Sequence, residues 1–160
     1  WLFTGSINEN VAYGAINPSE EEIYSAIEAA NIEHFVRSLP EGLKTNLTDE
    51  SAGISNGERQ LLTIARAFIA DPAILILDEA TSSVDTRTEV LVQKAMARLR
   101  SGRTAFVIAH RLSTIRDAHT ILVMNQGQLV EQGNHNELMA KKGFYFDLYS
   151  SQFTDAQEVN

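Results

Sequence analysis

Residues 74–79 read Ile-Leu-Ile-Leu-Asp-Glu, an apolar run that ends in two adjacent acids. A short run without polar residues is typical of a parallel strand buried on both faces. Such a strand needs helices over its sheet, so the run predicts an α/β fold with a mainly parallel sheet. Thr104–Ala109 predicts a second buried strand.

The segments around these strands carry helix and turn signals. Ser19 and Glu22 have the spacing of a capping box, which predicts a helix over residues 19–38. A second helix is expected over residues 57–70, and because no strand separates these two helices, they could form a separate lobe. The remaining predictions are a helix capped by Asp85 and ending near Leu99, a hairpin of 121–124 and 128–131, short helices near 135–140 and 144–149, and a loose tail from 151.

Composition excludes several classes of function. The chain has no Cys, so it forms neither a disulfide framework nor a Cys-based metal site. The formal net charge is −8, and the basic residues form no run, which argues against binding to nucleic acid. Even an apolar run such as Ala73–Leu77 is far shorter than the roughly 20 residues of a membrane span. We therefore expect the chain itself to be soluble.

Asp78 and Glu79 are candidate site residues because they follow a predicted parallel strand. Ligands of open α/β sheets bind at the carboxyl ends of the strands. One carboxylate there could hold Mg²⁺ through its water shell while the next polarises an attacking water. The alternative is a strand that exits into solvent with two surface acids.

Three motifs favour the functional interpretation. Asp78–Asp85 reads DEATSSVD, which resembles the Walker B and D-loop run of ATP-binding cassette (ABC) ATPases. Upstream, Ile54–Gln60 reads ISNGERQ and resembles the ABC signature. Downstream, Ile108–Ile115 reads IAHRLSTI and resembles the switch-histidine segment. The order and spacing of the three motifs make this resemblance very specific.

The resemblance extends from residue 1 to about residue 153. Glu9–Gly14 reads ENVAYG and is similar to the exporter-type nucleotide-binding domain, and the later segments are similar to one subunit of bacterial heterodimeric multidrug exporters. The resemblance implies part of a P-loop NTPase fold, with a helical signature lobe and a C-terminal hairpin. The expected divisions are 15–72 for the helical lobe, 73–153 for the rest of the catalytic core, and 154–160 for a polar tail.

The family's roles apply to the matching positions of this chain. The resemblance implies that Asp78 holds Mg²⁺ through water, that Glu79 is the general base or water-orienting carboxylate, and that His110 contacts the γ-phosphate of ATP. For His110 the alternative is a satisfied core histidine at a strand end.

The resemblance also implies a partner domain. The D-loop residues Ser82, Ser83 and Asp85 would face a second nucleotide-binding domain, in a heterodimer or a homodimer. The signature residues Ser55, Asn56, Gly57 and Glu58 would meet ATP bound on that partner, because a helix N-terminus presents free N–H groups to phosphate. A transmembrane domain in the same full-length chain would couple ATP hydrolysis to transport, with this domain at the cytoplasmic face of the plasma membrane.

Two departures from the usual L-S-G-G-Q bear on phosphate binding. Asn56 replaces a Gly, and its side chain takes space near the phosphate. Glu58 replaces Gln, so a carboxylate stands near a polyphosphate, where like charge should weaken binding. We therefore expect an asymmetric pair of sites, with this signature closing the weaker one. In the alternative, Glu58 points away, Arg59 compensates, and nothing changes.

The phosphate-binding P-loop does not occur in this sequence. No G-x-x-x-x-G-K-[ST] is present. We therefore expect the chain to be part of a longer protein and, alone, neither to bind ATP tightly nor to hydrolyse it. Two alternatives remain: a non-transport ABC ATPase of DNA repair or chromosome organisation, and a degenerate regulatory cassette.

Overall fold

The structure is a computed structural model that describes residues 2–47, 54–78, 85–109 and 115–154. The chain divides into two units, Trp1–Phe106 and Val107–Asn160. The mixed α/β class predicted from the sequence is confirmed. The elements are β1 (Gly5–Ser6), α1 (Ile7–Ala12), α2 (Glu20–Ala29), α3 (Glu33–Ser38), η1 (Gly42–Lys44), β2 (Asn46–Leu47), α4 (Asn56–Ala70), β3 (Ile74–Asp78), α5 (Thr86–Arg100), β4 (Thr104–Ile108), β5 (Ile121–Asn125), β6 (Gln128–Gly133), α7 (His135–Lys141) and α8 (Phe144–Thr154).

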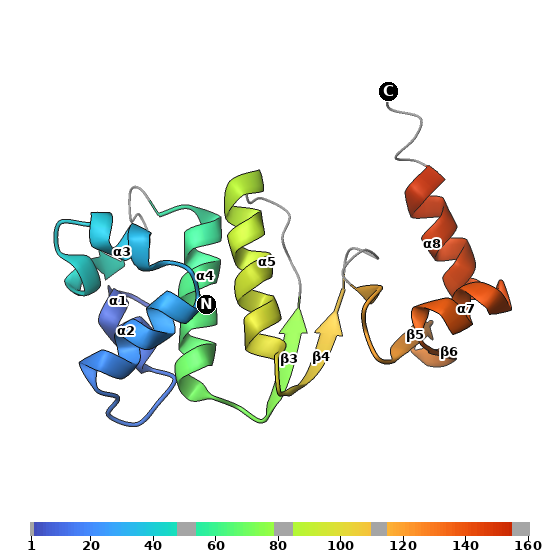
Figure 1. The fold of residues 1–160 in the computed structure, drawn as a ribbon, viewed down its shortest axis with the longest axis horizontal. Coiled ribbons are helices and arrows are strands. Elements are labelled where there is room, and N and C mark those ends of the chain that lie inside the picture. The colour runs from blue at the N-terminus through green and yellow to red at the C-terminus, as the bar shows by residue number, and fades with distance from the viewer. Residues whose placement is uncertain (1, 48–53, 79–84, 110–114, 155–160) are drawn as a thin grey trace. The chain divides into compact units, whose positions relative to one another are not determined.

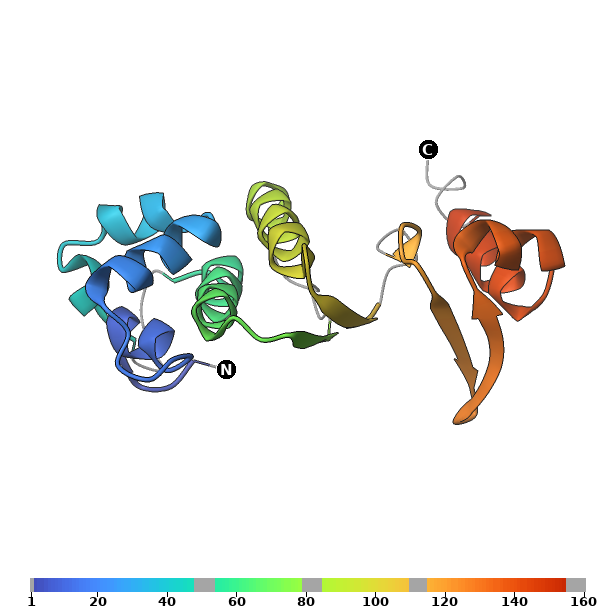
Figure 2. The same ribbon diagram turned by 60° about the horizontal axis from the view of Figure 1, so that its bottom comes forward.

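Helix α4 is the centre of the first unit. It packs against α1 and α2 on one side and against α5 on the other (Figure 2). Its buried side chains recur at helical spacing, which is the pattern expected of an amphipathic helix. They are Leu61, Leu62, Ile64 and Ala65. Burial on both sides makes α4 the element that holds the unit together.

The single helix predicted over residues 19–38 is wrong, because the chain turns at Asn31 and forms α2 and α3. Asn31 has a φ of 58°, in the left-handed region that Asn tolerates. Asn31 N–H donates to the Glu28 carbonyl at 2.9 Å, and Ile32 N–H donates to the Ile27 carbonyl at 3.2 Å. This pair of bonds, with Ile27 and Ile32 both buried, is a Schellman helix end.

The helix start predicted at Ser19 is confirmed. Ser19 Oγ accepts a hydrogen bond from Glu22 N–H, and the Glu22 carboxylate accepts one from Ser19 N–H. The same box opens α1 at Ser6 and Glu9, in a segment for which the sequence predicted no helix. Just before α1, β1 pairs antiparallel with β2, and the sequence predicted neither strand.

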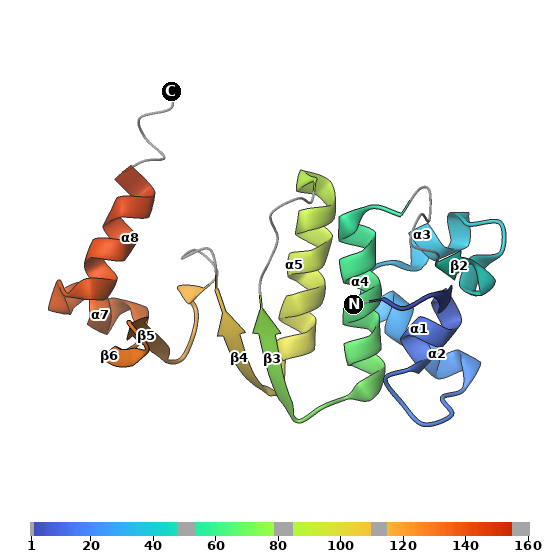
Figure 3. The same cartoon turned by 180° about the vertical axis from the view of Figure 1, so that it is seen from behind.

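Strands β3 and β4 are hydrogen-bonded neighbours. Their arrows point the same way in Figures 1 and 3, with α5 as the connection, as a parallel β-α-β unit requires. The prediction that these strands are buried on both faces, however, is wrong for the described residues. Leu75 is 5% exposed and joins the core, whereas Ile74 and Ile76 on the opposite face are 62% and 75% exposed. Phe106 of β4 is likewise exposed.

The second unit contains the predicted hairpin and the two predicted short helices. Strands β5 and β6 pair antiparallel, with Asn125 opposite Gln128. Gln126 and Gly127 between them have φ values of 47° and 77°, as a two-residue hairpin turn with right-handed twist demands. Helices α7 and α8 cover the hairpin, with Leu138 and Tyr145 buried. Helix α8 extends to Thr154, past the point where the sequence predicted a loose tail.

Across the described ranges, none of the helices combines the length and apolarity that a membrane crossing requires.

Candidate functional site

The signature residues form the start of helix α4. Ser55 is the N-cap, and its Oγ accepts a hydrogen bond from Glu58 N–H at 3.2 Å. Glu58 Oε2 in turn accepts from Ser55 N–H at 2.7 Å and from Ser55 Oγ at 2.8 Å. Ser55 and Asn56 are exposed, Glu58 is partly exposed, and Gly57 is buried. The Glu58 side chain is thus turned back onto the N-cap of its own helix.

Asp78 is the last residue of β3, and its side chain is exposed. The sequence predicted this location, because the apolar run of the strand gives way to an acidic residue at Asp78. The position leaves a carboxylate at the carboxyl end of a parallel strand, where ligands bind in α/β sheets.

Asp85 is the N-cap of α5, as the sequence predicted. Its Oδ1 accepts hydrogen bonds from Arg87 N–H at 3.1 Å and from Thr88 N–H at 3.0 Å. The bonds from Thr88, and to a smaller extent from Arg87, stabilise the charged form and lower the pKa of Asp85 from its usual value. Asp85 therefore stabilises the start of α5 through its own side chain.

Three of these features lie on one side of the first unit. Helices α4 and α5 both begin at the end of the unit toward which the β3 arrow points (Figures 1 and 3). The signature, Asp78 and Asp85 therefore share a side, although they come from three different elements. The other predicted site residues, Glu79, Ser82, Ser83 and His110, lie outside the described residues.

Asp78 fits a magnesium ion that is held mainly by water and substrate. Within the described ranges, no three potential metal-ligating side chains gather in one place. Mg²⁺ does not need such a cage, because it is usually held by one or two carboxylates together with waters and phosphate oxygens. An exposed carboxylate at a strand end matches that donor set.

The sequence did not reveal the polar contact between α1 and α4. Asn10 is fully buried, and its Oδ1 accepts from Phe3 N–H at 3.0 Å and from Arg66 Nη2 at 2.9 Å. Arg66 Nε donates to the Asn10 carbonyl at 2.7 Å. Burial of the guanidinium lowers the pKa of Arg66, an effect that nearby Tyr13 partly opposes. These residues are 56 positions apart in the chain, so no local pattern indicates their contact.

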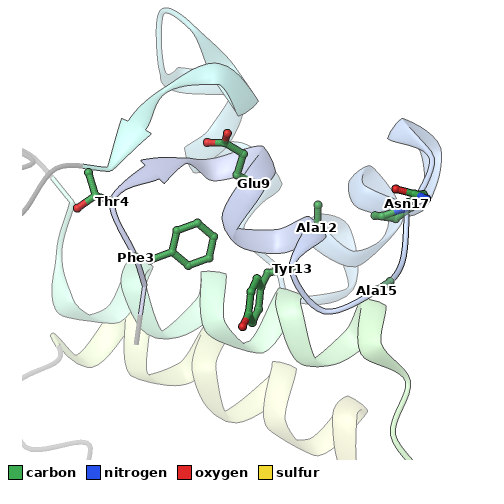
Figure 4. A pocket seen from close by; sticks show the side chains of 8 residues that line it. Phe3, Thr4, Glu9, Ala12, Tyr13, Ala15 and Asn17 are labelled. Atoms are coloured by element: carbon green, nitrogen blue, oxygen red, sulfur yellow. The ribbon is translucent and has the colours of Figure 1, made fainter.

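Two aromatic rings lie against the Arg66 guanidinium. Its Cζ lies 5.5 Å from the ring centroid of Phe3 and 5.5 Å from that of Tyr13, within cation–π range. Figure 4 shows the two rings beside each other over α4. They border a shallow pocket of about 450 Å³, whose lining residues are Phe3, Thr4, Glu9, Ala12, Tyr13, Ala15, Asn17 and Pro18. None of the site residues predicted from the sequence lines it.

Residues 2–82 match the family model described as "ABC transporter". The matched range includes the signature at the start of α4 and Asp78 at the end of β3.

Relatives with high identity are much longer than this chain. The chain is 57% identical over 148 residues to the "Fatty acid ABC transporter ATP-binding/permease protein" of Mycobacterium tuberculosis, covering 92% of the chain and 24% of that protein. It is 49% identical over 154 residues to the "ATP-dependent lipid A-core flippase" of Syntrophus aciditrophicus, covering 96% of the chain and 26% of that protein. The chain thus spans about a quarter of the length of these curated relatives.

A solved structure matches the described fold. It is the structure of a bacterial Atm1-family ABC exporter with ATP bound, and it aligns with a TM-score of 0.83 and 42% sequence identity. The alignment covers 94% of this chain and 26% of the exporter chain.

Proposed function

The chain belongs to the ABC transporter family, and from this premise we propose that it forms part of the ATP-binding and ATP-hydrolysing domain of an exporter. In the full-length protein, this domain would couple ATP hydrolysis to transport across a membrane. The observation that carries the proposal is the likeness to an ATP-bound exporter over 94% of the chain at 42% identity. Relatives whose names combine an ATP-binding part with a permease support the same conclusion.

The reacting side of the proposed site uses carboxylates. Asp78 would hold Mg²⁺ through water, and the ion would neutralise charge on the phosphates of ATP. Glu79, the next residue, would accept a proton from the attacking water or orient it for in-line attack. His110 would contact the γ-phosphate and keep that geometry. The exposed position of Asp78 at a strand end supports its part in this assignment.

The remaining residues would act on a partner domain. The start of α4, with the signature residues Ser55, Asn56, Gly57 and Glu58, would lie at the γ-phosphate of ATP bound to a second nucleotide-binding domain. Ser55 and Gly57 would make the contacts with that phosphate. Ser82, Ser83 and Asp85 would form the loop that contacts this partner in a heterodimer or a homodimer. The shared side of α4, α5 and β3 supports a single face for both tasks. A transmembrane domain of the same protein would place this face near the cytoplasmic side of the plasma membrane.

Residues 1–160 by themselves would be inactive. Backbone amides of a P-loop and its Lys are needed to hold the β- and γ-phosphates, and this sequence contains no such motif. Isothermal calorimetry on residues 1–160 should show no micromolar affinity for ATP.

The proposed function is tested with Glu79→Gln in the full-length protein, assembled with its partner domain. Removing the general base should lower the rate of ATP hydrolysis by about 100-fold or more, while ATP still binds. Glu28→Gln is the matched control, because Glu28 is an exposed glutamate of α2 that is not among the proposed site residues. Unchanged hydrolysis in Glu79→Gln would remove the catalytic assignment.

A further inference from the structure

The Glu58 carboxylate occupies the groups of Ser55 that a phosphate would need. One carboxylate oxygen, Oε2, accepts from both the N–H and the Oγ of Ser55, at 2.7 and 2.8 Å. In return, Ser55 Oγ accepts from Glu58 N–H at 3.2 Å. The exposed first turn of α4 is thus closed by an anion that belongs to the chain itself.

Phosphate and Glu58 make competing demands on Ser55. A serine hydroxyl carries one hydrogen, so it donates to either the carboxylate or a phosphate oxygen. The free N–H groups of a helix start attract an anion, and here the first anion present is the Glu58 carboxylate. A second anion at the same place would meet like charge at hydrogen-bond distance.

We propose that Glu58 is a built-in competitor of the nucleotide, whose carboxylate must release Ser55 before a phosphate group binds there. The competition raises the ATP concentration that closes this site and slows turnover at it. This inference rests on the proposed function, which assigns the start of α4 to ATP held by the partner domain. It gives a physical cause for two unequal sites in one assembly.

The chain contains a control for this arrangement. At the start of α2, the Glu22 carboxylate accepts from Ser19 N–H at 2.7 Å and from Ser19 Oγ at 2.8 Å, and Ser19 Oγ accepts from Glu22 N–H at 3.2 Å. These distances equal those at Ser55 and Glu58. Glu22→Gln therefore changes the same kind of cap at a helix start to which we assign no nucleotide.

Two substitutions at Glu58 separate charge from capping. In Glu58→Gln, the amide oxygen of the new side chain can still accept a hydrogen bond from Ser55 N–H. The helix start is therefore kept while the charge is removed. Glu58→Ala removes the acceptor altogether and leaves the Ser55 hydroxyl without its competing partner. Both variants should favour phosphate, and only the second should weaken the start of α4.

The experiment uses the full-length protein assembled with its partner domain. It measures the ATP dependence of hydrolysis and the amount of nucleotide retained at each of the two sites. Glu58→Gln should lower the half-saturating ATP concentration of the site closed by this signature by about three- to tenfold. Glu58→Ala should lower it as well, and Glu22→Gln should leave it unchanged.

The possible outcomes separate the inference from the proposed function. If the parent assembly hydrolyses ATP and neither Glu58 variant changes half-saturation or retained nucleotide, Glu58 is only a helix cap and the inference is wrong. A rise in half-saturation for both variants also overturns it, because Glu58 would then assist binding. An assembly that neither binds nor hydrolyses ATP overturns the proposed function, and the inference with it.

Discussion

Asn10 shows how much structure one buried amide can organise. Its Oδ1 accepts from Phe3 and Arg66, while its Nδ2 donates to the Phe3 and Ser6 carbonyls, both at 3.0 Å. The side chain therefore fixes the segment before α1 and the position of α1 against α4 at the same time. A buried polar group of this kind stabilises the fold because all its partners are satisfied.

Asn10→Ala should destabilise α1 locally by about 1–3 kcal/mol, because it removes the side-chain hydrogen bonds to the Phe3 amide, the Ser6 carbonyl and Arg66 Nη2. Hydrogen exchange of α1 and α4 peptides in the full-length protein measures the effect. Asn8→Ala is the control, since Asn8 lies on the same helix and is partly exposed. Equal losses of protection in both variants would contradict the organising role of Asn10.

Asp85 gives α5 a start that depends on pH. Its pKa is lowered in the folded protein, so its contribution is complete above the ordinary aspartate pKa of about 4 and is lost as the pH falls through the lower folded value. Protection factors of the first turn of α5, corrected for intrinsic exchange, should fall over that acidic range. Asp85→Asn keeps an N-cap acceptor that does not titrate, so its protection should not show this fall. The same acid profile in both proteins would assign the effect to another group.

At the level of elements, the close packing of α1 against α4 requires a glycine at position 14, just after α1. A Cβ added at Gly14 would lie 2.3 Å from the Arg66 carbonyl oxygen and 2.7 Å from Ile69 Cγ2. Both distances are far below van der Waals contact, and the first neighbour is backbone. Gly14 thus permits the close approach that Asn10 and Arg66 stabilise.

Gly14→Ala should therefore push α1 away from α4 and cost about 1–3 kcal/mol. Reduced exchange protection in both helices would report it. Gly102→Asn serves as the comparison, because nothing lies within 4 Å of a Cβ there and Asn tolerates the φ of 75°. Full protection of α1 and α4 in Gly14→Ala would show that the backbone relaxes without loss.

The elements that the sequence predicted correctly are each marked by a cap or turn motif only a few residues long. The capping box of α2, the cap of α5 and the β5–β6 turn are all of this kind, and so is the start of the signature helix. The break at Asn31 was missed because Phe35 continues the apolar spacing of α2, while the turn depends on the backbone at one residue. The pairing of Asn10 with Arg66 depends on neighbours that a linear pattern does not contain, because 56 positions separate the two residues. The direction of the Glu58 side chain does have a local signal, because Ser55 and Glu58 have the spacing of a capping box.

At the scale of the whole molecule, the open face of β3 and β4 is the main departure from the sequence-based expectation. A strand in which every residue is apolar predicts a sheet that is buried on both faces. The apolar pattern does not reveal which segments cover those two faces. Here the helices cover the face of Leu75, while Ile74, Ile76 and Phe106 remain more than half exposed. Contiguous apolar surface of this kind promotes association.

Residues 1–160, if expressed alone, should self-associate through this face. Ile76→Lys should shift the sedimentation profile toward monomer at micromolar concentration, because a charge interrupts the apolar surface. Ile16→Lys is the matched control, since Ile16 is 95% exposed but lies outside the sheet. If both variants behave alike, net charge rather than the sheet face governs association.

The same open face implies an order of events during folding. Helices α1, α2 and α4 contact one another within residues 7–70, so their core can close before the rest of the chain is available. The described residues leave the sheet face exposed, so it stays uncovered while that core forms. During that interval a nascent chain would present a finished helical core beside an uncovered apolar strand, which is the surface that chaperones bind.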